Sequence, residues 1–481
     1  MKQKSFNYTH KKHLIKDIFV QNPQDIQRHL LYFENLLGKE NAKADSIHKL
    51  AYSYDATREE REPDIVLFPR HENDISKILQ YCNKNLIPIV PRGAGSGFTG
   101  GSIVAKGGIV LALEKYMNKI LELDEKNLIV RVQPGVINKE LQNFVESHGL
   151  FYPPDPASEN QSTIGGNVSE NAGGMRAAKY GITKDYVMAI RAVLPNGDII
   201  RAGKKTIKDV AGYNVAGILI ASEGTLAVIS EITLKLLAKP KLKRSAMGIF
   251  DTIENAMNAV YKTMGSGVTP VAMEFLDNLS IRAVEEKFHK GLPIEAGAIL
   301  ITEVDGNLDS EIQYQLIQIE EKFKENGCTH FKIAKDDKDG EDLWFARKNV
   351  SQSISIYGKK KLNEDITVPR AKLPELLTAI QGVSEKYGFK IPCFGHTGDG
   401  NVHTNVMVED LNDLEKGHEA ITEIFKIAVD LEGTLSGEHG IGLAKAPFMN
   451  LAFSNAEMEL FRSIKKAFDP NNILNPNKMG L

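Results

Sequence analysis

The sequence is poor in cysteine and carries no excess of charge of either sign. Its 481 residues include three cysteines, Cys82, Cys328 and Cys393, which lie far apart and form no C-x-x-C pair. This spacing argues against a disulfide framework, a zinc ribbon and a cysteine-ligated iron–sulfur cluster. With 59 basic and 62 acidic side chains, the net charge is -3, so we expect no nucleic-acid partner.

Long apolar runs, internal repeats and low-complexity tracts are also missing. The longest apolar runs, such as residues 215–221, are far shorter than the ~20 residues that span a bilayer. The N-terminal residues are basic but lack the apolar segment of a secretory signal. We therefore expect a cytoplasmic protein that reaches the inner membrane, if at all, through a partner.

The length and the pattern of apolar residues predict several domains. We expect an N-terminal helical segment (1–61) and an α+β domain (62–241) whose many strands are joined by long glycine-rich connections. A rise in charge around Pro240 separates these from a second domain (242–411) in which strands and helices alternate, as α/β or α+β. A C-terminal helical segment (412–481) completes the chain.

The stretch PRGAGSGFTGG, residues 91–101, contains five glycines in eleven positions. Gly95, Gly97 and Gly100 match the G-x-G-x-x-G spacing of a dinucleotide-binding turn, but that turn must open a helix. Here SIVAKGGIVLAL follows, which predicts strand and turn, so the spacing is a coincidence. Glycines still allow backbone N–H groups to converge on an anion, although an ordinary flexible loop is the alternative.

A second stretch, residues 152–187, is unusually long for a loop and is rich in Gly, Asn, Ser and Thr. Long connections inside compact domains are usually functional or disordered. Apolar residues such as Ile164, Val168 and Met175 disfavour disorder because they anchor the segment. The composition suits a large, heteroatom-rich ligand such as a flavin with its ribityl chain.

A third stretch pairs two histidines around a tight turn. His396 and His403 flank a Gly-Asp-Gly sequence that can bring both imidazoles to one side, and Glu438 lies in the later GEHGIG. Together they match a 2-His-1-carboxylate set with open positions for substrate or water. For a single histidine, a core or surface residue would be the better interpretation.

Taken together and in this order, the three stretches resemble the vanillyl-alcohol-oxidase type of FAD-binding family. They are most similar to the branch of D-lactate dehydrogenases, the FAD subunit of glycolate oxidase and D-2-hydroxyglutarate dehydrogenase. The resemblance runs from Tyr52 to Met479, nearly the whole chain. It implies a PCMH-type FAD-binding domain of two α+β subdomains, a substrate (cap) domain, and a C-terminal segment that packs back near the flavin.

The resemblance also implies which residues hold FAD. The glycine stretch would bind the pyrophosphate, the second stretch would hold the flavin and ribityl chain, and later segments would contact the adenosine part. The residues carried over are Arg92, Gly93, Ala94, Gly95, Ser96, Gly97, Gly100, Pro154, Asp155, Thr163, Gly165, Gly166, Asn167, Asn171, Gly181, Glu223, Gly224 and Ile229. No histidine or cysteine matches a covalent attachment point, so we expect non-covalent FAD.

The third stretch resembles the catalytic centre of the same branch. By this resemblance, His396, His403 and Glu438 bind a divalent metal (zinc, manganese or iron) and His439 is the catalytic base. Arg347, in LWFARK, would hold the substrate carboxylate, and Asn405 would lie close to the substrate. An ion pair of Arg347 with the nearby Glu341 or Asp342 is the alternative for that arginine.

The implied activity is oxidation of a small 2-hydroxy acid, with D-lactate favoured. The FAD subunit of a multi-subunit glycolate oxidase is the alternative, with electrons passing to an iron–sulfur subunit, an electron-transfer flavoprotein or a quinone. Hydroxyglutarate enzymes carry a further basic residue where this sequence has Asn363, with Lys361 slightly upstream. This difference argues against D-2-hydroxyglutarate as the substrate. A transferase of the alkyl-dihydroxyacetonephosphate synthase type and a non-catalytic FAD-binding scaffold rank lower, since neither needs the metal set. The sequence leaves open whether two copies of the chain form a homodimer.

Overall fold

The computed structural model describes residues 23–481. The first 22 residues, including the basic N-terminus, lie outside this part of the chain. Of the expected N-terminal helical segment, the described residues form two helices, α1 (Pro23–Leu37) and α2 (Ser46–Ala51). Phe33 and Leu37 of α1 are buried in the core of the sheet that follows.

A first, four-stranded sheet carries the glycine stretch at the end of one of its strands. Its strands, in spatial order, are β1 (Ala42–Lys43), β2 (Ile65–Leu67), β4 (Ile109–Ala112) and β3 (Ile89–Arg92). Strands β2, β4 and β3 are parallel, and α3 (Glu72–Asn85) joins β2 to β3. After the glycines the chain enters β4 without a helix, which confirms that residues 91–101 do not open a Rossmann unit.

A second sheet has five antiparallel strands and forms the other half of the first body. Its strands, in spatial order, are β5 (Ile120–Asp124), β6 (Ile129–Val132), β10 (Val228–Lys235), β8 (Val187–Val193) and β9 (Ile199–Gly203). The connections contain α4 (Asn138–Glu146), β7 (Leu150–Phe151), α5 (Ile164–Glu170), α6 (Ala177–Tyr180), α7 (Val215–Leu219) and β11 (Leu237–Ala238). The two sheets confirm an α+β domain built from two subdomains.

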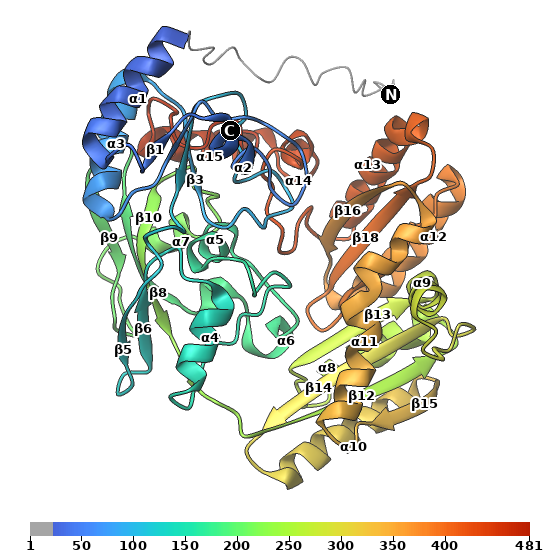
Figure 1. Ribbon diagram of the computed structural model, residues 1–481. Coiled ribbons are helices and arrows are strands. Elements are labelled where there is room, and N and C mark those ends of the chain that lie inside the picture. The colour runs from blue at the N-terminus through green and yellow to red at the C-terminus, as the bar shows by residue number, and fades with distance from the viewer. Residues whose placement is uncertain (1–22) are drawn as a thin grey trace.

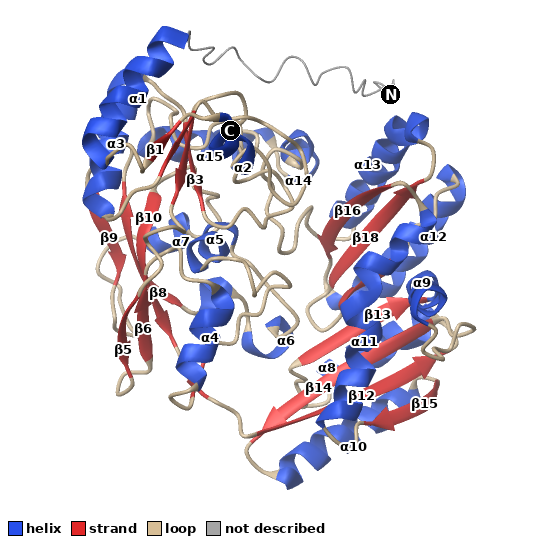
Figure 2. Cartoon of the chain, viewed as in Figure 1, coloured by secondary structure: helices blue, strands red, loops and turns tan. Residues whose placement is uncertain are grey.

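The second body is built on a seven-stranded sheet (Figure 2). Its order is β15 (Cys328–Ile333), β12 (Leu242–Phe250), β14 (Ala298–Gly306), β13 (Ala272–Asp277), β17 (Cys393–His396), β18 (Asn401–Val408) and β16 (Lys360–Thr367). Every recorded pairing is antiparallel, so of the two classes expected here α+β is the right one.

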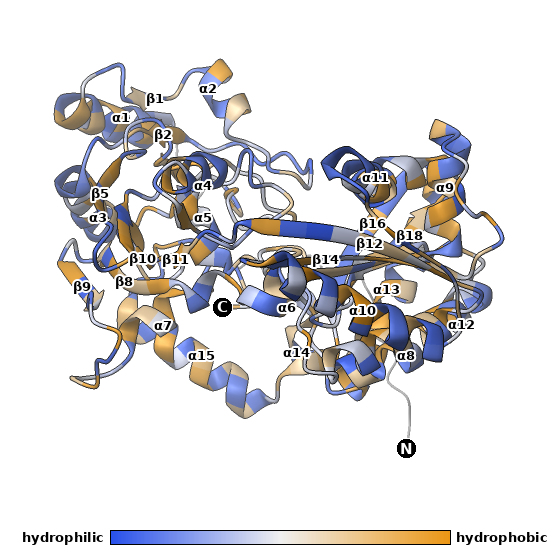
Figure 3. Ribbon diagram, turned by 90° about the horizontal axis from the view of Figure 1, so that it is seen from below, coloured by the Kyte–Doolittle hydropathy of each residue, from blue (hydrophilic) through white to orange (hydrophobic). Residues whose placement is uncertain are grey.

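Helices cover this sheet, and each helix buries one stripe of its own side chains. They are α8 (Ile253–Met264), α9 (Asn278–Phe288), α10 (Asp309–Glu325), α11 (Asp337–Ser353), α12 (Leu373–Tyr387) and α13 (Leu414–Asp430). Along α8 the buried residues are Ala256, Met257, Ala259, Val260 and Thr263. Figure 3 shows the resulting alternation of hydrophilic and hydrophobic residues around α8 and α10, as expected for amphipathic helices. No helix among the described residues is long and apolar enough to cross a membrane.

The chain's C-terminal part is shared between the two bodies. Helix α13 packs on β16 and β18, and α14 (Met449–Ala452) packs against α13, whereas α15 (Asn455–Phe468) lies beside the N-terminal elements (Figure 1). Beyond α15, Leu474 bridges to Ile89 of β3 as an added parallel partner. The expected boundaries at 61, 241 and 411 stay predictions, but α13 and α15 pack in different cores.

Asn475 fastens this tail to the glycine stretch. It is 1% exposed, and its Nδ2 donates to Gly101 O at 2.8 Å and to Glu223 O at 2.6 Å. Lys478, fully buried, donates to Ile103 O at 2.6 Å. The last residues of the chain therefore hold two loops of the first body in place.

We predict that Asn475→Ala lowers the free energy of unfolding by about 2–4 kcal/mol. The substitution leaves two buried carbonyl groups without their donor, and alanine fits the left-handed backbone at φ 40° poorly. Chemical denaturation measures the change. Asn471→Ala is the matched control and should change stability little, since Asn471 is exposed and its Nδ2 donates to the Asn83 side chain at 2.9 Å. An unfolding midpoint that is equal in both variants would contradict the role of Asn475.

Candidate functional site

A cleft opens between the glycine stretch, the loop around α5 and the C-terminal loop. Its empty volume is about 1170 Å³ including the open mouth, which suits a large ligand. The lining comes from residues 91–98, 101–102, 156–158, 162–173 in part, 223–229 in part, and from Glu438 and His439. Segments that the sequence places far apart therefore form one wall.

The glycine stretch offers this cleft a row of free donors. Within the described residues, no backbone N–H from Gly93 to Gly101 donates a recorded hydrogen bond. The buried Arg92 side chain fixes the loop from behind, by donating to Tyr54 O at 2.8 Å and Ser102 O at 3.3 Å. A Cβ on Gly93 would overlap Thr163 Oγ1, so only glycine fits there. Converging N–H groups in a cleft suit a diphosphate, and the residues present fit FAD.

Most of the FAD residues expected from the sequence line the cleft. These are Arg92, Gly93, Ala94, Gly95, Ser96, Gly97, Thr163, Gly165, Gly166, Asn167, Glu223, Gly224 and Ile229. Thr163 also caps α5 by accepting from Gly166 N at 3.2 Å. Gly165 packs so closely on Pro134 that an added Cβ would lie 2.4 Å from Pro134 Cβ, closer than real Cβ atoms approach a neighbour.

The remaining expected FAD residues lie outside this lining. Pro154 O accepts from Asn138 and Gln142, while Asn171 and Gly181 end helices with positive φ angles. Gly100 has φ 77° and packs near Leu443. Asp155 lines a neighbouring cleft against the second body, where burial raises its pKa to about 7 despite the Arg176 guanidinium.

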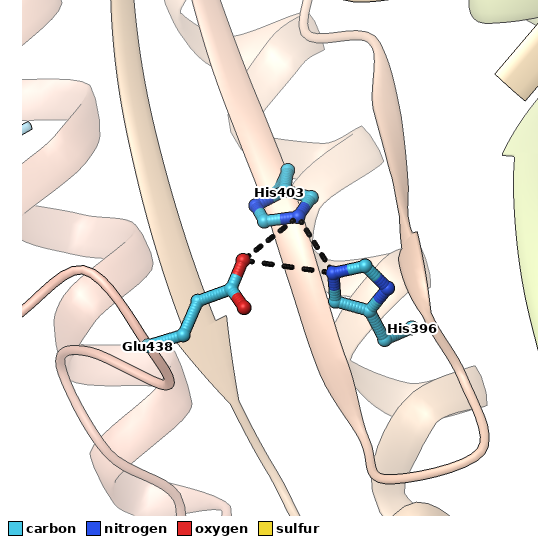
Figure 4. Close-up of side chains that lie close together, drawn as sticks. All are labelled: His396, His403 and Glu438. Carbon is cyan, nitrogen blue, oxygen red and sulfur yellow. Dashed lines mark hydrogen bonds and ion pairs between the residues drawn. The ribbon is translucent and has the colours of Figure 1, made fainter. Parts of the chain in front are cut away.

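His396 and His403 come together because β17 and β18 form a hairpin (Figure 4). Their Nε2 atoms lie 3.3 Å apart, and Glu438 Oε1 lies 3.5 Å from His396 Nε2 and 3.6 Å from His403 Nε2. Glu438 comes from the loop after α13, and the three ligand atoms all lie within 4.8 Å. The chain can therefore present two imidazoles and a carboxylate to one divalent cation.

Glu274 supports the histidine pair from β13 and also holds Arg347. Its fully buried carboxylate lies 2.7 Å from His396 Nδ1 and accepts from Arg347 Nε at 2.6 Å. Although burial lowers the pKa of His396, Glu274 and Glu438 raise it well above its usual value. The side chain of Arg347 is 12% exposed and stacks over Phe394. This buried pairing contradicts the alternative of a surface ion pair with nearby acidic residues.

Asp365, buried at the end of β16, organises the loop that carries His439. Its carboxylate accepts from the backbone N–H groups of Gly437, Glu438 and His439 at 2.9, 2.7 and 3.0 Å. It also pairs with His439 Nδ1 at 3.3 Å and with the buried Lys445 ammonium. Burial raises the pKa of Asp365, but His439 and Lys445 outweigh this and hold it well below its usual range. His439 in turn has a raised pKa.

Asn405 lies two residues beyond His403 on β18, opposite Asn363 of β16. It is fully buried, and its Nδ2 donates to Pro392 O and His403 O at 3.2 Å each. Its Oδ1 has no recorded partner among the described residues. A buried acceptor without a donor is costly.

Sequence reasoning missed Glu274, Asp365 and Lys445. Glu274 is the single acidic residue in the apolar strand PVAMEFL, and an acidic residue in such a strand is a signal in itself. Asp365 lies two residues after Asn363, the position that the sequence analysis compared with the hydroxyglutarate enzymes, and was not itself considered there. Their partners, His396 and the loop at 437–439, are remote in sequence, so pairing them needed the fold.

The comparisons with known proteins agree with the geometry. Residues 63–203 match the "FAD binding domain" family model, and residues 239–479 match the model "FAD linked oxidases, C-terminal domain". The chain belongs to the FAD-linked oxidase family. It is an FAD-dependent oxidoreductase with a PCMH-type FAD-binding domain, as the resemblance implied.

Individual relatives of this FAD-linked oxidase span nearly its whole length. "Glycolate oxidase subunit GlcD" of Bacillus subtilis (strain 168) is 40% identical over 95% of this chain and 97% of its own. "D-lactate dehydrogenase" of Anaerostipes hadrus is 34% identical over 87% and 89%. Among solved structures, p-cresol methylhydroxylase has the same fold, with a TM-score of 0.79, 15% identity and coverage of 96% and 98%.

We predict that Asp365→Asn lowers the free energy of unfolding at neutral pH by about 3–5 kcal/mol. The variant removes the nearer of the two carboxylates that pair with the buried Lys445 ammonium and leaves only Glu364, whose Oε2 lies 3.4 Å from Lys445 Nζ. Because the pKa of Asp365 is depressed, its stabilising effect is present above the pKa of an unfolded aspartate and is lost as the pH falls through the folded value.

Chemical denaturation at neutral and acidic pH measures this difference. The exposed Asp410, whose carboxylate accepts from Asn412 N at 3.0 Å, gives the matched control Asp410→Asn, which should leave stability nearly unchanged. A difference between wild type and Asp365→Asn that does not shrink on acidification would speak against the assigned charge.

Proposed function

We propose that this protein oxidises a small 2-hydroxy acid to the 2-oxo acid, using non-covalent FAD and a divalent metal ion. The supporting observation is that Glu438 and His439 border the FAD cleft while Glu438 also meets His396 and His403. A metal site and a redox cofactor would thus share one wall. FAD, when bound, accepts a hydride, and the metal, when bound, polarises an oxygen ligand.

The chain's own residues would bind and orient the substrate. Arg347 is held by Glu274 through Nε, which leaves the other guanidinium nitrogens to bind a carboxylate. Asn405 Oδ1 is free to accept from a hydroxyl group. His439, fixed by Asp365 at Nδ1, has Nε2 available to take the hydroxyl proton, and Asp365 stabilises the resulting charge.

The substrate we favour is D-lactate, and glycolate is the alternative. Relatives named D-lactate dehydrogenase and relatives named as a subunit of glycolate oxidase both match this chain over most of its length, so both assignments have equal support. A subunit name indicates partner chains, and we propose that electrons leave to a partner or a quinone. We also propose a cytoplasmic location, with any attachment to the inner membrane made through that partner.

A dye-reduction screen tests the activity. We expect turnover with D-lactate or glycolate, weaker turnover with L-lactate and D-2-hydroxyglutarate, and a divalent metal in the same sample. His439→Ala should lower kcat by about 10²–10⁴-fold because it removes the base. Retained FAD absorbance in that variant is the control. Undiminished oxidation by His439→Ala, or no turnover of any 2-hydroxy acid, would refute the proposal.

We predict that Glu274→Gln lowers the affinity for the bound metal by about 10–100-fold. The Glu274 carboxylate is not one of the proposed metal ligands. It contacts His396 at Nδ1, and this contact orients the imidazole ring whose Nε2 faces the proposed site. Competition with a chelator measures the affinity, with Glu303→Gln on the neighbouring strand β14 as control, since Glu303 pairs with the exposed Lys243. Equal metal affinity in both variants would show that Glu274 has no such role.

A further inference from the structure

Glu170 is a carboxyl group in the cleft with no recorded hydrogen bond to the part of the chain that the structure describes. It is the last residue of α5 and lines the cleft beside Glu223. Its Oε2 is buried without a recorded partner among the described residues, and none of the FAD residues expected from the sequence includes it. A buried polar atom left unpaired costs free energy, so the side chain needs a reason to be there.

Two glycines make room for this carboxyl group. A Cβ on Gly101 would lie 2.8 Å from Glu170 Oε1, and a Cβ on Gly440 would collide with Oε2. Gly101 ends the glycine stretch, and Gly440 follows His439 in the C-terminal loop. The carboxyl group therefore sits between the wall that suits a diphosphate and the wall that carries the candidate catalytic residues.

Glu223 is the neighbouring carboxyl group, and burial raises its pKa although two backbone N–H groups act against this. Its Oε1 accepts from Ile441 N and its Oε2 from Gly442 N, both at 2.7 Å, so both oxygens have donors. Glu170 has none. Burial raises the pKa of Glu170 well above its usual value, and the Glu223 charge raises it further. Two carboxylates in one buried place cannot both ionise cheaply, and the one without donors keeps the proton.

We propose that Glu170 is a protonated acid that donates a hydrogen bond to bound FAD. The inference rests on FAD binding, which the family shows, and not on the identity of the substrate. A neutral carboxyl group supplies a donor where an ionised one would repel an anionic diphosphate. Its acceptor on FAD replaces the hydrogen bond that the protein itself does not provide.

FAD affinity of the full-length protein tests the proposal without turnover. Apoprotein is titrated with FAD, and the quenching of flavin fluorescence gives Kd. Glu170→Gln keeps a neutral donor of the same shape, so its Kd should stay within about threefold of wild type. Glu170→Ala removes the donor and should weaken binding by about 10–100-fold. Glu146→Ala is the control, because Glu146 lies outside the cleft and pairs with Lys239. This variant should bind FAD as tightly as wild type.

The pH profile gives the second measurement. As the pH rises through deprotonation of Glu170, wild type should lose FAD affinity, whereas Glu170→Gln should not show this loss. The other charges that face Glu170 are Asp55, Glu223, Asp365 and Lys478. They are present in both proteins, so the difference between the two profiles isolates Glu170.

Three results would overturn the proposal: Glu170→Ala binds FAD as tightly as wild type, Glu170→Gln binds as weakly as Glu170→Ala, or the two pH profiles coincide. Circular dichroism of the apoproteins checks that each variant is folded, and Glu170→Gln keeps the test decisive if Glu170→Ala is not. Failure of the proposed 2-hydroxy-acid oxidation gives a different result. The FAD affinities of the variants would then still differ as expected here, but no 2-hydroxy acid would reduce the dye.

Discussion

The Asp365 carboxylate is the interaction on which the candidate site depends. Three successive backbone N–H groups, a histidine and a lysine converge on it from one loop. The same loop places Glu438 beside the histidine pair, and its Ile441 N–H donates to the Glu223 carboxylate. A single buried anion in the second body thus sets the geometry of a wall that the first body completes.

The strongest sequence signals gave the right local structure. The glycine stretch, the β-rich segment after it and the histidines around Gly-Asp-Gly are local patterns, and each appears in the fold where it was expected. The prediction that the glycine stretch is not a dinucleotide-binding turn was right because that motif requires a helix directly after the glycines. A dozen residues are enough to predict that strand and turn follow instead.

What could not be predicted depends on partners remote in the chain. Nothing local to Glu274 indicates that His396 and Arg347 will share its carboxylate, and Glu170 acquires its unusual surroundings only when Gly101 and Gly440 meet. The division of the C-terminal segment between two cores has the same origin. Helical periodicity identifies α13 and α15 as amphipathic but does not say which sheet each will cover.

The bridge from Leu474 to Ile89 has a consequence for how the protein is made. The first sheet is encoded near the start of the chain, yet one of its edges is completed by residues near the end. On the ribosome, that edge stays open until residue 474 has been made, and contacts so distant in sequence form slowly. An intermediate in which Leu474 has not yet docked therefore has an unfinished edge on its cofactor domain.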